Sequence, residues 1–120
     1  MKRLYIALAL FCLLTILYFA EQHLVSEKLY DFQIEMEKVQ TLALGGDFST
    51  AYDNGKNAVD ALMGNADVFN FFVDEDKTEK IFENASRYLE FIIAEKTAEF
   101  NAEYSVLRQS VLQALENAKG

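Results

Sequence analysis

The stretch that decides the fold of this chain is LYIALALFCLLTILYFA, residues 4–20, a run of seventeen residues without a charge. Its six leucines, two isoleucines and two phenylalanines each favour insertion into lipid by about 0.3–0.6 kcal/mol, or about 3–6 kcal/mol together. A helix of this length rises about 26 Å, and Tyr5, Tyr18 and Phe19 extend it into the two interfacial belts. Residues 1–20 are therefore predicted to form an amino-terminal transmembrane anchor.

Two other interpretations of the run are a cleaved signal peptide and a buried core helix. Cleavage after Ala20 is disfavoured because Tyr18 would stand third from the cut, where a small residue is needed. Lipid modification at Cys12 is disfavoured because the preceding Phe11 is too large. Cys12 is the only cysteine, so it is interpreted as a small apolar filler, with a disulfide between two copies in the membrane as the alternative.

Charge is distributed unevenly about this run. Lys2 and Arg3 precede it, whereas all nineteen acidic residues follow it, and the whole chain has a net charge of −8. The positive-inside rule keeps the amino terminus in the cytoplasm and places residues 21–120 outside the cell membrane, as an extracytoplasmic helical bundle on a single-pass protein. The acidic outer part repels phosphate backbones, so nucleic acid is excluded as a partner. Membrane lipid, contacted through residues 4–20, is the first predicted partner.

Beyond the anchor, apolar residues recur at alternating spacings of four and three, which is a heptad pattern. The residues of this seam are Val25, Leu29, Phe32, Met36, Val39 and Ala43. No glycine or proline separates them from the apolar run, so residues 4–44 are expected to form one helix. The same heptads serve either an intramolecular bundle or a coiled coil between copies, so a homo-oligomer stays open.

A turn is predicted at the glycine pair 45–46, because glycine accepts the left-handed conformation that ends many helices. Asp47 is the expected cap of the next helix, which is predicted over residues 48–72 with a kink near residues 64–65. Small residues on its apolar face, Gly55 among them, are expected to let a neighbouring helix approach closely.

Two further helices follow. One is predicted over residues 75–95 with Asp74 as its cap, and the other over residues 98–118 with Thr97 as its cap. The boundary between them is weakly marked, so a continuous helix is the alternative. Short connections between segments of similar length favour antiparallel neighbours. The sequence thus predicts an all-α fold in which a single transmembrane helix continues into an antiparallel up-down bundle of three or four helices.

Residues that could carry catalysis are sparse. The single histidine, His23, and the single cysteine are too few for a zinc, iron or copper cluster, and no nucleotide-binding or nucleophile motif is present. Asn84-Ala85-Ser86 matches the glycosylation pattern but lies within a predicted helix. We therefore expect no catalytic residue, no metal site, no cofactor and no enzyme activity.

Two groups of apolar residues are candidate contact sites. An aromatic group, interpreted as packed core rather than as the lining of a ligand cavity, comprises Phe48, Tyr52, Phe69, Phe71 and Phe72. Leu24, Ile34 and Leu42 lie off the heptad seam of the first helix. These three either touch a second helix of the bundle or form an exposed strip for a partner helix, and they are the predicted partner contacts.

Three segments carry a resemblance to a known family: the MKR start with its apolar run, the GDFSTAY segment at residues 46–52, and the stretch over residues 69–89. In these segments the chain resembles a bacterial family of small, single-span proteins that is described only as a domain of unknown function. The family often has a histidine near the position of Asp74 and a tryptophan in the second helix, whereas this chain has no tryptophan. The resemblance implies a helical fold and membrane attachment, and it implies no activity.

These features predict an outward-facing helical protein that acts as a non-catalytic binding or scaffold module at the bacterial cell envelope. Its expected partners are other envelope or membrane proteins, with a homo-oligomer as a further option. The alternative function is a sensor-like or small-ligand-binding four-helix bundle, since bundles hold ligands between their helices.

Overall fold

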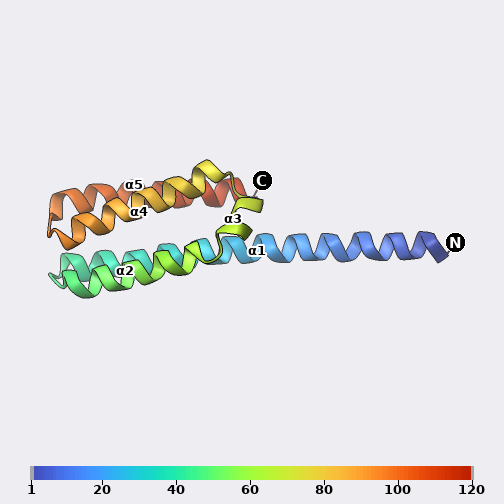
Figure 1. Cartoon of the computed structure of the whole chain (residues 1–120), viewed down its shortest axis with the longest axis horizontal. Helices are drawn as coiled ribbons and strands as arrows, with labels where there is room; N and C mark the ends of the chain where they lie inside the picture. Colours follow the sequence, from blue (N-terminus) through green and yellow to red (C-terminus); the bar gives the residue numbers. More distant parts are fainter. Residues whose placement is uncertain (1, 120) are drawn as a thin grey trace.

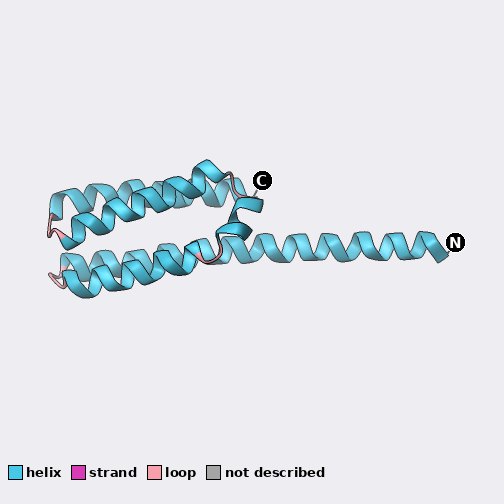
Figure 2. Cartoon of the chain, in the orientation of Figure 1, coloured by secondary structure: helices cyan, strands magenta, loops and turns pink. Residues whose placement is uncertain are grey.

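The chain is helical almost throughout in its computed structural model, which describes residues 2–119 except for the side chains of residues 70–72 and 119. The five helices are α1 (Lys2–Leu44), α2 (Phe48–Met63), α3 (Ala66–Phe72), α4 (Glu75–Ile93) and α5 (Thr97–Lys119). Within the described residues there is no strand (Figure 2). The prediction of an all-α fold is therefore confirmed.

Helix α1 is 43 residues long and has two different halves. In its second half the six predicted seam residues are all buried, each at most 4% exposed. In its first half every residue of the apolar run is exposed, and Figure 1 shows this half projecting alone beyond the other helices. The run is long and apolar enough to cross a membrane. Its exposure rules out the interpretation as a buried core helix.

The second half of α1 packs with α2, α4 and α5 around one core. Helix α1 contacts α2 and α5, and α4 contacts the same two helices. Figure 1 shows the α1–α2 and α4–α5 connections at one end of this group, with α3 and the carboxyl terminus at the other end. Helix α3 contacts α1 and α4. The largest fully buried side chains include Tyr88, Phe100, Leu29 and Met36, which come from three of the helices.

The turn between α1 and α2 has the structure that its glycines predict. Gly46 has a φ of +90°, which is a left-handed conformation. Its N–H donates to the carbonyl of Ala43 (3.1 Å), and the N–H of Asp47 donates to the carbonyl of Leu42 (3.0 Å). The Asp47 carboxylate accepts from the N–H of Thr50 (3.4 Å) and so caps α2. Both the turn and the cap are confirmed.

The turn between α4 and α5 repeats this motif without a glycine. Glu95 has a φ of +59°, its N–H donates to the carbonyl of Ile92, and the N–H of Lys96 donates to the carbonyl of Phe91, both at 2.9 Å. The two helices are therefore separate, which the sequence left undecided. Helix α5 begins at Thr97 itself, so the prediction that Thr97 precedes the helix as its cap is wrong by one position.

Replacing Glu95 with glycine is expected to raise the free energy of unfolding by about 1 kcal/mol. A residue with a side chain in the left-handed conformation costs roughly 1–2 kcal/mol, and the greater freedom of glycine in the unfolded chain offsets part of the gain. Thermal unfolding of the full chain in detergent micelles, followed by circular dichroism, measures the change. Gly46→Ala is the matched opposite, expected to lower stability by a similar amount. Equal stability of Glu95→Gly and the wild type would contradict the left-handed turn.

The predicted second helix over residues 48–72 is two helices, α2 and α3, separated at Gly64 and Asn65. The side-chain amide of Asn65 donates to the carbonyl of Ala61 (3.0 Å). This carbonyl is the one that the backbone N–H of Asn65 would use in a continuing α-helix. Glycine at the preceding position lowers helix propensity further. The predicted kink is thus a complete break.

Asp74 occupies the position before α4, but its side chain makes no cap hydrogen bond with that helix. Its backbone N–H donates to Oδ1 of Asn117 in α5 (2.8 Å), while Nδ2 of Asn117 donates to the Asp74 carboxylate (3.4 Å). The prediction of a side-chain cap at Asp74 is therefore wrong. The Asp74 carboxylate accepts from Asn117 of α5 instead. Glu75 and Asp76 supply the negative charge in the first turn of α4.

Candidate functional site

The three predicted partner contacts differ in exposure. Leu24 is 43% exposed and Ile34 is 50% exposed, whereas Leu42 is half-buried and packs against the core. Leu24 and Ile34 are ten residues apart, about 15 Å along the helix axis. The structure therefore keeps two of these residues at the surface of α1 and does not bring the three together.

The aromatic group predicted to be packed core has three members whose side chains are described. Phe69 is 2% exposed, and Phe48 and Tyr52 pack against the core cluster. The Phe48 ring meets the Phe100 ring edge to face, with 6.3 Å between their centroids. The side chains of Phe71 and Phe72 lie outside the described residues. The described members fit the packed-core interpretation.

Two grooves lie between neighbouring helices. The first, between α1 and α2, has a volume of about 200 Å³, which is below the usual size of a ligand pocket. It exists because Ala58 and Ala61 on α2 are small, and Phe32 and Leu62 form its apolar floor. Lys28, Asp31, Glu35 and Asn65 complete its lining. It can accept little more than one side chain of a partner.

The second groove, which we name the α4–α5 groove, has a volume of about 540 Å³. Its lining residues are Lys80, Glu83, Asn84 and Arg87 from α4, and Ser105, Val106, Gln109, Ser110 and Gln113 from α5. All but Val106 are polar or charged. The groove therefore offers polar groups to a ligand beside the aliphatic parts of the same side chains.

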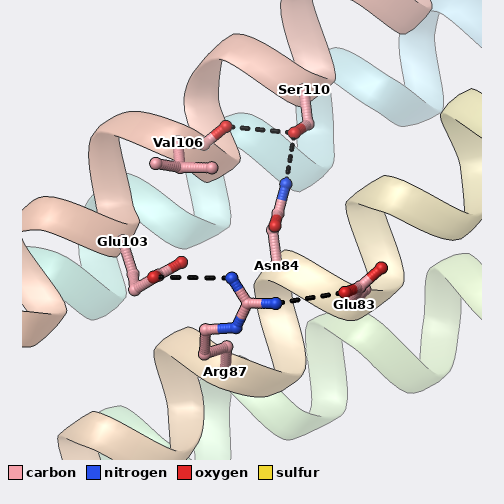
Figure 3. A network of polar contacts seen from close by, with 6 residues as sticks. All are labelled: Glu83, Asn84, Arg87, Glu103, Val106 and Ser110. Carbon is pink, nitrogen blue, oxygen red and sulfur yellow. Dashed lines mark hydrogen bonds and ion pairs between the residues drawn. The ribbon is translucent and has the colours of Figure 1, made fainter.

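A short chain of hydrogen bonds links three lining residues of this groove, Asn84, Ser110 and Val106 (Figure 3). Nδ2 of Asn84 donates to Oγ of Ser110 (2.5 Å), and this hydroxyl donates to the carbonyl of Val106 (3.0 Å). The nitrogen that a glycosylation would modify is thus engaged in a half-buried contact between two helices. Asn84 therefore has a structural role, as a link between α4 and α5, that does not depend on glycosylation.

Arg87, a lining residue of the groove, links α4 with α5 through two ion pairs (Figure 3). Its Nη2 lies 3.1 Å from Oε1 of Glu83 on α4, and its Nη1 lies 3.7 Å from Oε1 of Glu103 on α5. The Glu103 side chain is only 16% exposed, and its Oε2 is buried without a hydrogen bond within the described part of the chain. Arg87 therefore supplies the positive charge that compensates this half-buried carboxylate.

Other side chains of the groove are available to a ligand. Lys80 forms no ion pair among the described residues, and Ser105, Gln109 and Gln113 stand four residues apart on one side of α5. A cation, a hydroxyl and two amides can bind a small molecule that carries a carboxylate and an amide. The lining holds no pairing of a nucleophile with a base.

A second polar contact links α1 with α4 and α5. The hydroxyl of Tyr88, a fully buried residue, donates to Oε1 of Gln40 (2.5 Å), and Nε2 of Gln40 donates to Oδ1 of Asn101 (2.5 Å). Burial raises the pKa of Tyr88, and the neighbouring Tyr104 raises it further. Tyr88 therefore stays protonated and remains the donor to Gln40.

Replacing Tyr88 with phenylalanine is expected to lower stability by about 1 kcal/mol at neutral pH, because the Gln40 carbonyl loses its donor. Because the pKa of Tyr88 is raised in the folded chain, folding favours the protonated hydroxyl. The contribution of this preference to the free energy of unfolding is fully present below the usual tyrosine pKa of 10.0. That stability is lost as the pH rises further, because the unfolded chain then ionises first. The difference between variant and wild type should therefore narrow between about pH 9 and about pH 11. Urea unfolding across this range tests it, and a constant difference would contradict it.

At the end of the domain near the apolar run, Nε2 of Gln22 donates to the carbonyl of Ala118 in α5. Gln22 and Gln40 stand eighteen residues apart, which is five helical turns, so they lie on the same side of α1. The sequence analysis did not identify them, nor the residues of the α4–α5 groove. The sequence feature that could have identified them is the repetition of glutamines on one side of a helix. These are Gln22 and Gln40 in α1, and Gln109 and Gln113 in α5.

The described residues contain no group of three or more histidine, cysteine, aspartate or glutamate side chains that could hold a metal ion. His23 is exposed beside the apolar run. No family model, curated protein or solved structure matches the chain. The candidate sites are therefore the exposed apolar half of α1, the surface around Leu24 and Ile34, and the α4–α5 groove.

Proposed function

We propose that the protein is a single-pass membrane protein whose helical domain is a non-catalytic binding or scaffold module at the bacterial cell envelope. The observation that carries this proposal is the continuity of α1, which is exposed along residues 4–20 and forms a wall of the core along residues 25–43. A helix of this kind ties a folded domain to lipid without a linker. The proposal includes membership of the bacterial single-span family that the chain resembles.

The proposed topology places the amino terminus in the cytoplasm and the domain outside, following Lys2 and Arg3. The four long helical segments then form an antiparallel up-down bundle that stands on the membrane. Gln22, which contacts the end of α5, follows the apolar run by two residues, so the base of the bundle would lie at the headgroup region. Leu24, near this base, and Ile34, further out, would face other envelope or membrane proteins.

An amine-reactive cross-linker that cannot cross the membrane tests orientation and binding together on intact cells. Lys38, Lys56 and Lys80 are exposed on the domain and are expected to react, whereas Lys2 is expected to be protected. Mass spectrometry of the purified chain identifies the modified lysines, any cross-linked protein, and the residue at which the mature chain starts. Reaction only after the cells are broken would contradict the orientation. Reaction on intact cells without any cross-linked protein would contradict the binding function.

The alternative function, binding of a small polar ligand, is favoured by the α4–α5 groove. Acetyl-glutamate is a suitable probe because its carboxylates match Lys80 and its amide matches Gln109. Thermal unfolding of the full chain in detergent micelles should shift to higher temperature with this probe. Lys80→Gln should abolish the shift, and Lys56→Gln on α2 is the matched control that should keep it. No shift in the wild type would count against this class of ligand.

A further inference from the structure

We infer that a second copy of this chain packs in parallel along the side of α1 that faces away from the core, with Cys12 opposite Cys12 of the second copy. This side, which we name the outer line of α1, is represented by Ala9, Cys12, Ile16, His23, Tyr30 and Ile34. The inference rests on the proposed membrane insertion of residues 4–20. It names one partner of the scaffold and the face that this partner takes.

The other sides of α1 are already occupied in the second half of the helix. The buried seam faces the core. Lys28 and Glu35 border the groove with α2, while Gln22 and Gln40 contact α5 on the opposite flank. The outer line faces away from both flanks along this half, and on it Ile34 is 50% exposed.

The same line continues without interruption into the apolar run, because α1 is one helix from Lys2 to Leu44. At about 100° per residue, the six representative residues fall within about 60° of one another, opposite the seam. A partner helix that follows Ala9, Cys12 and Ile16 through lipid therefore meets Tyr30 and Ile34 beyond it. A partner on the side of Leu14, which continues the seam, would collide with the folded domain.

A second copy fits this line because the line is complementary to itself. A two-fold dimer brings the same surface of each copy together, and two copies inserted with the same orientation are parallel. Ala9 and Cys12 are small enough for two helix backbones to approach closely in lipid, and Ile16 and Ile34 add apolar contact. Glu27 on this line, with Asp31 and Glu37 at its two edges, lies in the aqueous half, where salt screens the repulsion between the copies.

The length of the line provides sufficient contact area. From Tyr5 to Thr41 the helix rises about 54 Å. A contact strip about 10 Å wide would bury roughly 1,100 Å² over the two copies, which is just above the minimum of about 1,000 Å² for a specific interface. The apolar run alone would supply less than half of this area. Both halves of α1 are therefore needed for a stable pair.

The experiment is oxidative cross-linking of the full chain in its own membranes. Copper phenanthroline oxidises two Cys12 thiols to one disulfide, with two protons released and two electrons passed through copper to oxygen. We expect a covalent dimer as the main product. The matched control is Cys12→Ser combined with Leu14→Cys, which moves the thiol to the seam side at nearly the same depth, and it should give at least five-fold less dimer. Equal cross-linking at both positions, no dimer through Cys12, or an adduct with another protein would overturn the inference.

A second variant tests the aqueous half of the line. Ile34→Glu lies about 33 Å from Cys12 along the helix, at a position exposed enough to accept a charge in the folded domain. It is expected to reduce cross-linking through Cys12 several-fold while the circular dichroism spectrum stays unchanged. Undiminished cross-linking in Ile34→Glu would overturn the extended interface. Flotation of membranes on a density gradient distinguishes failure of the membrane anchor from failure of the dimer. A chain that does not float contradicts the anchor, whereas a chain that floats but does not cross-link contradicts only the dimer.

Discussion

Replacing Gly55 with leucine is expected to destabilise the helical domain by about 2 kcal/mol or more. Gly55 lies on α2 where this helix meets α1 and α4. A Cβ atom added there would overlap Cδ2 of Leu89 and lie 3.5 Å from Cγ1 of Val39, and both neighbours are buried. Overpacking of this kind costs about 1–3 kcal/mol and occasionally more, which outweighs the gain of up to about 1 kcal/mol in helix propensity.

Thermal unfolding of the full chain in detergent micelles measures this effect, which corresponds to a fall of roughly 8–16 °C in Tm for a domain of about 100 residues. Gly64→Leu is the matched control, because a Cβ at Gly64 meets only backbone oxygens at 3.5 and 3.6 Å. Leu89→Ala makes room beside Gly55, so the double variant should be more stable than the sum of the two single effects by about 1 kcal/mol or more. Strict additivity would contradict the close contact between α2 and α4.

The buried face of α1 could be predicted from the sequence because it depends on local spacing. The six residues of the predicted seam, from Val25 to Ala43, are the six buried residues of that helix. The turn at Gly46 and the cap at Asp47 were predictable for the same reason, since each rests on the conformational preference of one residue type. In these segments, local preference and tertiary packing favour the same structure.

The later helix boundaries depend on contacts that the sequence does not reveal. The turn between α4 and α5 was not marked by a glycine, because Glu95 adopts the left-handed conformation there although its residue type disfavours it. Asn65 ends a helix by using its side chain on a carbonyl of the preceding turn. Asp74 was expected to cap α4, but Asn117, from the last turn of α5, takes its carboxylate. Tertiary partners decided the structure at Asp74, and they cannot be read from spacing.

The α4–α5 groove was missed for a related reason. Lys80 and Gln109 are ordinary polar residues on the outer faces of two helices, and only the packing of α4 against α5 places them in one groove. The exposed residues of α1 were easier to identify. Leu24 and Ile34 stand out as apolar residues off the seam, and both are exposed, whereas Leu42 packs against the core.

The largest effect is expected from the double variant Leu10→Arg with Leu14→Arg, which should detach the chain from the membrane. An arginine near the centre of a span costs about 2.5–3.5 kcal/mol, so two of them cost about 5–7 kcal/mol, more than the roughly 2.4–4.8 kcal/mol by which the eight remaining leucines, isoleucines and phenylalanines favour insertion. Both residues are exposed along the unburied half of α1, so the substitutions leave the core of the helical domain intact. Flotation of cell membranes on a density gradient, with detection of the chain in each fraction, measures the loss.

The matched control adds the same two charges to the helical domain, as Asn54→Arg with Asn57→Arg. Both asparagines are exposed on α2, so this variant should stay in the floating membrane fraction with the wild type. The comparison separates an effect on insertion from an effect of net charge, because the two variants have the same charge. If the Leu10 and Leu14 variant floats as the wild type does, another part of the chain or a partner protein holds it at the membrane. Continuity between the span and the bundle would then lose its role in the function that we propose.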